Sequence, residues 1–288
     1  MSTQTLNSTP SMLPLFARAG LAAIPGASRL PFVGGGAREM PDLTLVLDGA
    51  RVERERLASY DRVCRFQLSD TLPPTYPHML VFPLHLRLMT DPSFPFPAIG
   101  LVHIANRITQ HRPIRVGETM SLKVWATPLE PHPRGRQFAL RSEVRVGSEL
   151  VWEEVSTNLR RGSGASDGAR QPGPAPADEL DPAAVWQLRG DLGRRYGAVS
   201  GDLNPIHVHP LTARLFGFPG AIAHGMWTKA RCLAALEPRL PDAFTVEVAF
   251  RKPIVLPARV QFARSDRQFA VRDAAKGTPH LDGELSDA

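Results

Sequence analysis

The chain has 288 residues, of which 43% are hydrophobic and 22% charged, and its formal net charge is +6. This balance is typical of a globular protein with a sizeable core, and it excludes a disordered or fibrous chain. No run of about 20 apolar residues occurs, so we expect no membrane-spanning helix. The basic residues are mixed with acidic ones, as in "RVERER" (51–56), instead of forming a stripe for nucleic acid.

The start of the chain shows no targeting signal. Arg18 interrupts the first apolar stretch and no basic residue precedes that stretch, so we expect no signal peptide. The two cysteines, Cys64 and Cys232, form no CxxC or Cys/His zinc spacing. The glycine run "VGGGA" (33–37) is not followed by a helix pattern, so we do not interpret it as a phosphate loop. We therefore expect a cytoplasmic protein that uses no metal and no cofactor.

In chain order, the sequence divides into four regions. Residues 1–40 form an N-terminal extension of unassigned role. Residues 41–160 contain an apolar helix pattern, "HMLVFPLHLRLM" (78–89), followed by alternating strand patterns. Residues 161–182 are rich in Gly, Ala and Pro, which is the composition of a linker. Residues 183–288 form the last region.

The last region carries the clearest pattern. Residues 224–236 place apolar side chains on more than one face of a helix, which indicates a helix that is buried on most sides. Val246, Val248 and Phe250 alternate with other residues, as in a half-buried strand. Two shorter strands are indicated by Val260 with Phe262 and by Phe269 with Val271. A sheet that wraps around a central helix is the simplest way to bury that helix, and this arrangement is the hotdog fold.

The two halves of the chain resemble each other. Tyr60 corresponds to Tyr196, and "RPI" (112–114) corresponds to "KPI" (252–254), at similar offsets. Two matches in the same order suggest a duplicated fold. We therefore expect an α+β chain with a double hotdog, in which each half is an antiparallel sheet around a long central helix.

The segment "YGAVSGDLNPIH" (196–207) places an Asp, an Asn and a His within six residues. Pro205 keeps the residue before it out of the helical region, so the chain bends between Asp202 and His207. A carboxylate and an imidazole that converge can position a water and remove its proton, because imidazole has a pKa of about 6.5. The alternative is a structural turn, in which Asp202 and Asn204 cap helices.

A second feature lies downstream, where the buried helix is expected to begin with His224 and Gly225. Amides at a helix start point outward at the positive end of the helix dipole, so the N–H of Gly225 is a candidate oxyanion donor. Alternatively, Gly225 serves tight packing and His224 is a buried residue that holds the loop. His209, directly before Pro210, is expected to be a capping or surface residue.

These motifs resemble the MaoC-like dehydratases, also called R-specific enoyl-CoA hydratases. The resemblance rests on "YGAVSGDLNPIH" and on "FGFPGAIAHGM" (216–226), and it covers the C-terminal half directly. The N-terminal half, with "TYPHMLVFP" and "IANRITQHRPIRVGE", is more loosely similar to the degenerate hotdog of two-domain members.

The resemblance implies roles for individual residues. Asp202 and His207 would be the catalytic pair, and Asn204 would order their turn. The amide of Gly225 would bind the thioester oxygen. Many members have Asp where this chain has His209, a departure that leaves the catalytic residues intact.

The implied activity is that of a hydro-lyase, which hydrates trans-2-enoyl thioesters reversibly or dehydrates (3R)-3-hydroxyacyl thioesters in fatty-acid metabolism. The substrate would be a CoA or acyl-carrier-protein thioester, with Arg251, Lys252 and His224 as substrate-binding candidates. We expect one active site per chain, in the C-terminal hotdog, with the N-terminal hotdog lining the acyl tunnel. The chain would be a monomeric pseudo-dimer or a homodimer. The alternatives are a hotdog acyl-thioesterase and a non-catalytic acyl-thioester binding module.

Overall fold

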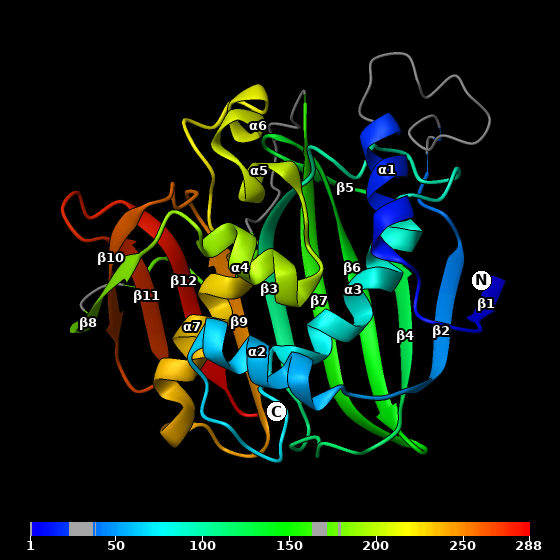
Figure 1. Cartoon of the computed structure of the whole chain (residues 1–288), viewed down its shortest axis with the longest axis horizontal. Helices are drawn as coiled ribbons and strands as arrows, with labels where there is room; N and C mark the ends of the chain where they lie inside the picture. Colours follow the sequence, from blue (N-terminus) through cyan, green and yellow to red (C-terminus); the bar gives the residue numbers. More distant parts are fainter. Residues whose placement is uncertain (1, 23–36, 38, 163–171, 178–179) are drawn as a thin grey trace. The chain divides into compact units, whose positions relative to one another are not determined.

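The computed structural model describes residues 2–22, 37, 39–162, 172–177 and 180–288 (Figure 1). Half of the linker predicted at 161–182 (residues 163–171 and 178–179), and all of "VGGGA" except Ala37, lie outside the described residues. None of the described helices combines the length and the hydropathy that crossing a bilayer requires.

The chain forms two compact units that interleave in sequence. The N-terminal unit contains residues 1–51, 77–104 and 117–172, and the C-terminal unit contains residues 52–76, 105–116 and 173–288. Two segments from the first half of the sequence therefore cluster with the second half. The division into hotdogs at 41–160 and 183–288 stays a prediction.

The N-terminal unit is a mostly antiparallel sheet with two helices. Its sheet has the strand order β1-β2-β4-β6-β7, with β5 paired to β6. Of the described strand pairs in this sheet, only the outermost one, β1 with β2, is parallel. The elements are β1 (Ser2–Leu6), α1 (Met12–Ala22), β2 (Leu43–Ala50), α3 (Tyr76–Met89), β4 (Met120–Ala126), β5 (Glu130–His132), β6 (Gly135–Val146) and β7 (Glu149–Arg161).

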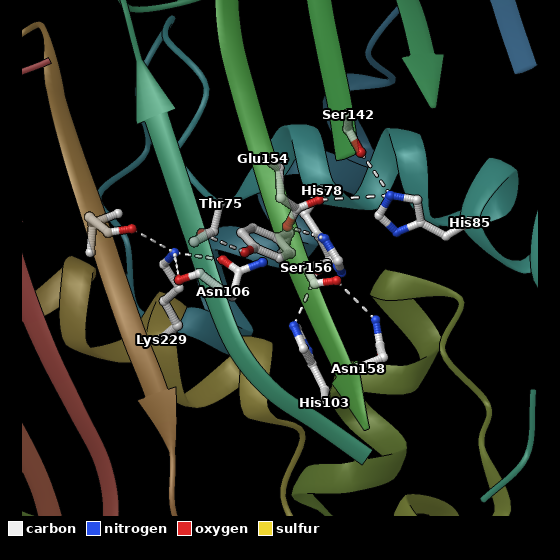
Figure 2. Close-up of polar contacts among 12 residues, drawn as sticks. Thr75, His78, His85, His103, Asn106, Ser142, Glu154, Ser156, Asn158 and Lys229 are labelled. Atoms are coloured by element: carbon white, nitrogen blue, oxygen red, sulfur yellow. Dashed lines mark hydrogen bonds and ion pairs between the residues drawn. The ribbon is translucent and has the colours of Figure 1, made fainter. Parts of the chain in front are cut away.

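The predicted apolar helix of the first half is α3, and it is buried along most of its length. Its two histidines bond to the sheet through a polar cluster. His78 Nδ1 lies 2.7 Å from Glu154 Oε1, and His85 Nε2 lies 2.7 Å from Ser142 Oγ. Figure 2 shows these side chains pointing toward one another between the helix and strands β6 and β7. The cluster ties α3 to its sheet, because buried polar groups need hydrogen-bond partners.

The C-terminal unit contains a fully antiparallel sheet with the order β3-β9-β12-β11-β10-β8. Strand β3 (Val102–Gln110) contributes its residues from Ala105 onward to this unit. The other strands are β8 (Asp181–Leu188), β9 (Phe244–Phe250), β10 (Ala258–Arg264), β11 (Gln268–Asp273) and β12 (Pro279–Ser286). The helices are α2 (Arg54–Cys64), α4 (Leu192–Ser200), α5 (Pro205–Val208), α6 (Pro210–Leu215), α7 (Gly225–Leu236) and the 3-10 turn η2 (Glu237–Arg239).

Helix α7 confirms the buried helix predicted at 224–236, since eight of its twelve residues are buried. Lys229 in its middle is fully buried. Its ammonium group donates to Asn106 Oδ1 at 2.6 Å, to the Asn106 carbonyl and to the Val246 carbonyl, both at 3.2 Å (Figure 2). A buried charge is tolerated when hydrogen bonds surround it, and here those bonds join α7 to β3 and β9.

The predicted strands around Val248, Val260 and Phe269 are confirmed as β9, β10 and β11, whereas β8 and β12 were not predicted. The two matched tyrosines, Tyr60 on α2 and Tyr196 on α4, meet with ring centroids 6.2 Å apart. Both cysteines are buried free thiols, and burial raises the pKa of each, so neither is a reactive nucleophile.

Candidate active site

The catalytic segment proposed from the sequence, here residues 200–207, begins where α4 ends. Gly201 has φ of 80°, a conformation that glycine adopts without strain, and it turns the chain out of the helix. Three hydrogen bonds, each between residues two positions apart, then stabilise the turn. The Ser200 hydroxyl accepts from the Asp202 N–H at 3.1 Å, and Asp202 Oδ1 accepts from the Asn204 N–H at 3.1 Å. Asn204 Oδ1 accepts from the Ile206 N–H at 3.3 Å.

Asn204 thus caps α5, which begins with Pro205 at its first position. This is the turn-ordering role that the resemblance implied for Asn204. The capping alternative also holds in part, because one oxygen of Asp202 is used within the turn. The other oxygen, Asp202 Oδ2, lies 3.7 Å from His224 Nε2, and the chemical role of the carboxylate stays a prediction.

His207 lies on α5, and the hydrogen bond of one ring nitrogen fixes the tautomer of the ring. Nδ1 is 2.8 Å from the carbonyl oxygen of Ile222. A carbonyl can only accept, so Nδ1 carries the proton and Nε2 keeps its lone pair. Burial lowers the pKa of His207, while Asp202 and the Ile222 carbonyl oppose that shift. The ring is therefore a neutral base at neutral pH.

The structure brings Asp202, His207 and His224 together. One ring nitrogen of each histidine and one carboxylate oxygen of Asp202 lie within 4.8 Å of one another. A water that bonds at about 2.8 Å to two groups can span a gap of up to about 5 Å. The Asp202 side chain keeps 26% of its surface exposed, so the pair is accessible. A carboxylate and a basic imidazole can therefore hold one water between them.

Two glycines of α4 support the catalytic segment. A Cβ built on Gly193 would lie 1.9 Å from the His207 carbonyl oxygen, and one on Gly197 would lie 2.9 Å from the Asp202 carbonyl oxygen. Any side chain at Gly193 would push the backbone of His207 away. The sequence prediction missed this role, although the spacing of four residues places both glycines on one face of the helix.

Gly225 is the first residue of α7, as predicted. Helical amides in the first turn have no acceptor within the helix, and His224 provides no side-chain cap for them. A Cβ on Gly225 would lie 3.0–3.1 Å from the ring of Phe250. Gly225 therefore allows tight packing, which was the alternative role predicted for it. The oxyanion role of the Gly225 amide stays a prediction.

The remaining predicted residues lie in different surroundings. Arg251 Nε forms an ion pair with buried Asp282 at 2.7 Å, and its Nη2 donates to the Pro174 carbonyl. Lys252 is exposed. Their contact with substrate stays a prediction, and the engagement of Arg251 in internal bonds gives it little freedom to reach a ligand. His209 caps α6 by accepting from the Leu211 N–H at 3.2 Å, as predicted.

Among the residues that the structure describes, two groups of side chains have the residue types of a metal site, namely His78 with His85 and Glu154, and Asp202 with His207 and His224. In the first, the 2.7 Å contact of His78 with Glu154 is a hydrogen bond, whereas tetrahedral zinc ligands lie about 3.3 Å apart. In the second, the rings of His207 and His224 are nearly parallel, at 25°, so their lone pairs do not converge. The first group is thus joined by a side-chain hydrogen bond, and in the second group each histidine bonds to a backbone carbonyl.

Comparisons with known proteins show the family of the chain. Residues 175–276 match the family model of the MaoC like domain, which includes the catalytic segment and α7. The chain is 38% identical over 277 residues to 3-hydroxyacyl-thioester dehydratase X of Mycobacterium tuberculosis, covering 94% of this chain and 96% of that protein.

Solved structures show the same relationship. The crystal structure of HtdX of Mycobacterium tuberculosis superposes with a TM-score of 0.76 and 37% identity, over 85% of this chain and 100% of that chain. A MaoC-like dehydratase from Phytophthora capsici shares the fold, with a TM-score of 0.68 and 18% identity, over 88% and 95% of the two chains. The predicted double hotdog is thereby confirmed, and the chain belongs to the MaoC-like dehydratase family.

Proposed function

We propose that this protein is a hydro-lyase that hydrates trans-2-enoyl thioesters reversibly and dehydrates (3R)-3-hydroxyacyl thioesters. One observation carries the proposal. The Asp202 carboxylate and the His207 imidazole lie within 4.8 Å of each other, and the Ile222 carbonyl holds His207 in the tautomer that can accept a proton. The relative from Mycobacterium tuberculosis, named a 3-hydroxyacyl-thioester dehydratase, supports the same reaction type.

The reaction needs a base for water and a donor for the thioester oxygen. In the hydration direction, His207 Nε2 removes a proton as the water oxygen bonds to C3, with Asp202 orienting the water. Negative charge moves onto the thioester oxygen as an enolate, which the Gly225 N–H would stabilise. The carboxylate–imidazole pair then returns one proton to C2. Water adds across the double bond and the thioester stays intact.

The acyl carrier, the assembly and the cell compartment belong to the same proposal. We propose a CoA or acyl-carrier-protein thioester of fatty-acid metabolism as substrate, a monomeric pseudo-dimer or a homodimer as the active form, and the cytoplasm as its location. The predicted role of the N-terminal hotdog, which is to line the acyl tunnel, is part of this proposal too.

Product analysis with crotonyl-CoA tests the proposal. We expect (3R)-3-hydroxybutyryl-CoA with the thioester intact, and the reverse reaction from the same (3R) product. Release of free CoA faster than hydration would instead identify an acyl-thioesterase. Binding of crotonyl-CoA without any turnover would identify a non-catalytic binding module.

A further inference from the structure

His224 contacts both members of the catalytic pair. It directly precedes α7, and its backbone carbonyl accepts from the N–H and the hydroxyl of Thr228 in the first turn of that helix. Only 4% of its side chain is exposed. The residue is therefore anchored by the helix and is buried, although it stands beside a site that a substrate must reach.

The first contact of His224 holds the turn that carries Asp202. His224 Nε2 lies 3.1 Å from the Asp202 carbonyl oxygen and 3.7 Å from Asp202 Oδ2. Because the carbonyl can only accept, Nε2 carries the proton. Nδ1 is then bare, and it is buried with no hydrogen-bond partner among the described residues. A histidine kept only for structure would normally bond through both nitrogens.

The second contact of His224 is with the catalytic ring itself. The rings of His224 and His207 stack with centroids 3.7 Å apart, at an interplanar angle of 25°. Tyr196 of α4 packs on His224 as well, at 4.8 Å. The stack covers one face of His207, which limits both the tilt of its ring and the access of water to that face.

From these contacts we propose that His224 is a positioning residue, which sets the distance between Asp202 and His207 by bonding to one and stacking on the other. This inference rests on the proposed function, because the pair it orders is the proposed catalytic pair. It assigns His224 a different role from the substrate contact that the sequence suggested. The side chain acts through its neighbours and does not touch the reacting atoms.

The charge state of His224 fits this role. Burial first, and His207 second, lower the pKa of His224 to about 3. The stacked ring is therefore neutral at every pH at which the enzyme would work, and it adds no positive charge beside the imidazolium that forms on His207. Three other titratable or charged groups lie near the two stacked histidines. They are Asp202, Tyr196, which packs on His224, and Arg194, which donates to the Val208 carbonyl.

Two substitutions separate the two contacts. His224→Phe keeps a ring to stack on His207 but has no N–H for the Asp202 carbonyl. His224→Gln keeps an N–H donor but has no ring. We expect each to lower kcat for crotonyl-CoA about 10- to 100-fold, because displacement by about 1 Å is enough for such a loss. KM should stay within about threefold, since no substrate contact is removed.

The pH profile distinguishes positioning from general structural support. Without the ring, His207 is less buried, so the acidic limb of kcat/KM should move to higher pH in His224→Gln. It should stay in place in His224→Phe. The control is His209→Asn, which keeps the cap of α6 and should leave kcat, KM and the pH profile unchanged. Unchanged kcat and unchanged limbs in both folded variants would overturn the proposal, and a change in KM alone would restore substrate binding as the role.

A measurement on the unaltered protein covers the case in which the variants do not fold. Nitrogen NMR of the histidine rings should show His224 neutral with its proton on Nε2, and His207 neutral with its proton on Nδ1. A proton on Nδ1 of His224 would remove the bond to Asp202 and overturn the inference. Absence of hydration by the unaltered protein would instead refute the proposed function, while the NMR result would still report on the His224 contacts.

Discussion

The two units use the same residue types, histidine beside a carboxylate, in opposite ways. In the N-terminal unit, Glu154 accepts from His78, and the carboxylate side chain has no exposed surface (Figure 2). In the C-terminal unit, Asp202 lies beside His207 and keeps 26% of its side chain exposed. A carboxylate sealed in a core ties a helix to a sheet, whereas one that reaches solvent can bind a water.

The starts of the two central helices differ in the same sense. Helix α7 opens with Gly225, which has no side chain of its own, and His224 provides no side-chain cap for the first-turn amides. Helix α3 opens with Tyr76 followed by Pro77, so its first turn has a bulky side chain and lacks one N–H. Among the described residues, the two central helices thus begin differently, and the single active site expected in the C-terminal hotdog stays a prediction.

The largest effect that would test this comparison comes from the helix under the catalytic turn. Gly193→Ala would place a Cβ 1.9 Å from the His207 carbonyl oxygen. The turn must shift, and we expect hydration to fall by about 10²-fold or more. The measurement is the crotonyl-CoA hydration rate per folded molecule. The control is Gly190→Ala, whose Cβ has only one neighbour, at 3.9 Å. Equal activity of both variants would contradict the supporting role of Gly193.

The next effect concerns the N-terminal cluster and is one of stability. Glu154→Gln removes the charge that pairs with His78, and we expect the free energy of unfolding to fall by about 3 kcal/mol. Denaturant unfolding measures this change, and Glu149→Gln, at an exposed position of the same strand, is the control. The hydration rate per folded molecule should be unchanged. A folded, inactive Glu154→Gln variant would show that the cluster takes part in the reaction.

The smallest effect concerns Asp61, a buried carboxyl of the C-terminal unit. Its Oδ1 has no hydrogen-bond partner among the described residues. Burial first, and Glu237 second, raise the pKa of Asp61 to about 7. The folded state thus binds this proton more tightly than the unfolded state, in which the pKa is about 3.9. Stability from this group is complete below about pH 4 and is lost as pH rises to about 7.

We therefore expect Asp61→Asn to stabilise the protein by about 1–2 kcal/mol at pH 8, and to have little effect at pH 4. Urea unfolding at the two pH values measures the difference. Asp70, which is exposed on the following loop, provides the control variant Asp70→Asn. Equal effects of Asp61→Asn at both pH values would contradict the raised pKa.

The sequence predicted the elements that have a clear period, and it missed those that depend on the tertiary fold. Helix α7 and strands β9 to β11 follow from apolar periodicity. Strand β12 was missed because "PHLDGELS" has few apolar residues and contains Gly283. A Cβ at Gly283 would lie 2.2 Å from the Phe269 ring, so this glycine is required by a packing contact with another strand. Strand β8 begins with Asp181, Pro182 and two alanines at the end of the predicted linker, where a strand pattern is weak.

For the candidate site, the sequence predicted that two residues lie close together and missed the contacts that orient them. The bend at Pro205 was enough to place Asp202 and His207 near each other. The Ile222 carbonyl that sets the tautomer of His207 lies fifteen residues away from it, and the stacked His224 lies seventeen residues away. Such contacts are set by how α7 packs against the turn, and no local pattern reveals them.

The proposed reaction needs Asp202 and His207 together to activate one water for addition to an enoyl thioester. Its most direct test is the rate of crotonyl-CoA hydration by Asp202→Asn and His207→Ala, at equal concentrations of folded protein. We predict that each rate falls by about 10²- to 10⁴-fold with the fold intact. A folded His207→Ala variant that hydrates crotonyl-CoA at the unaltered rate would contradict the claim.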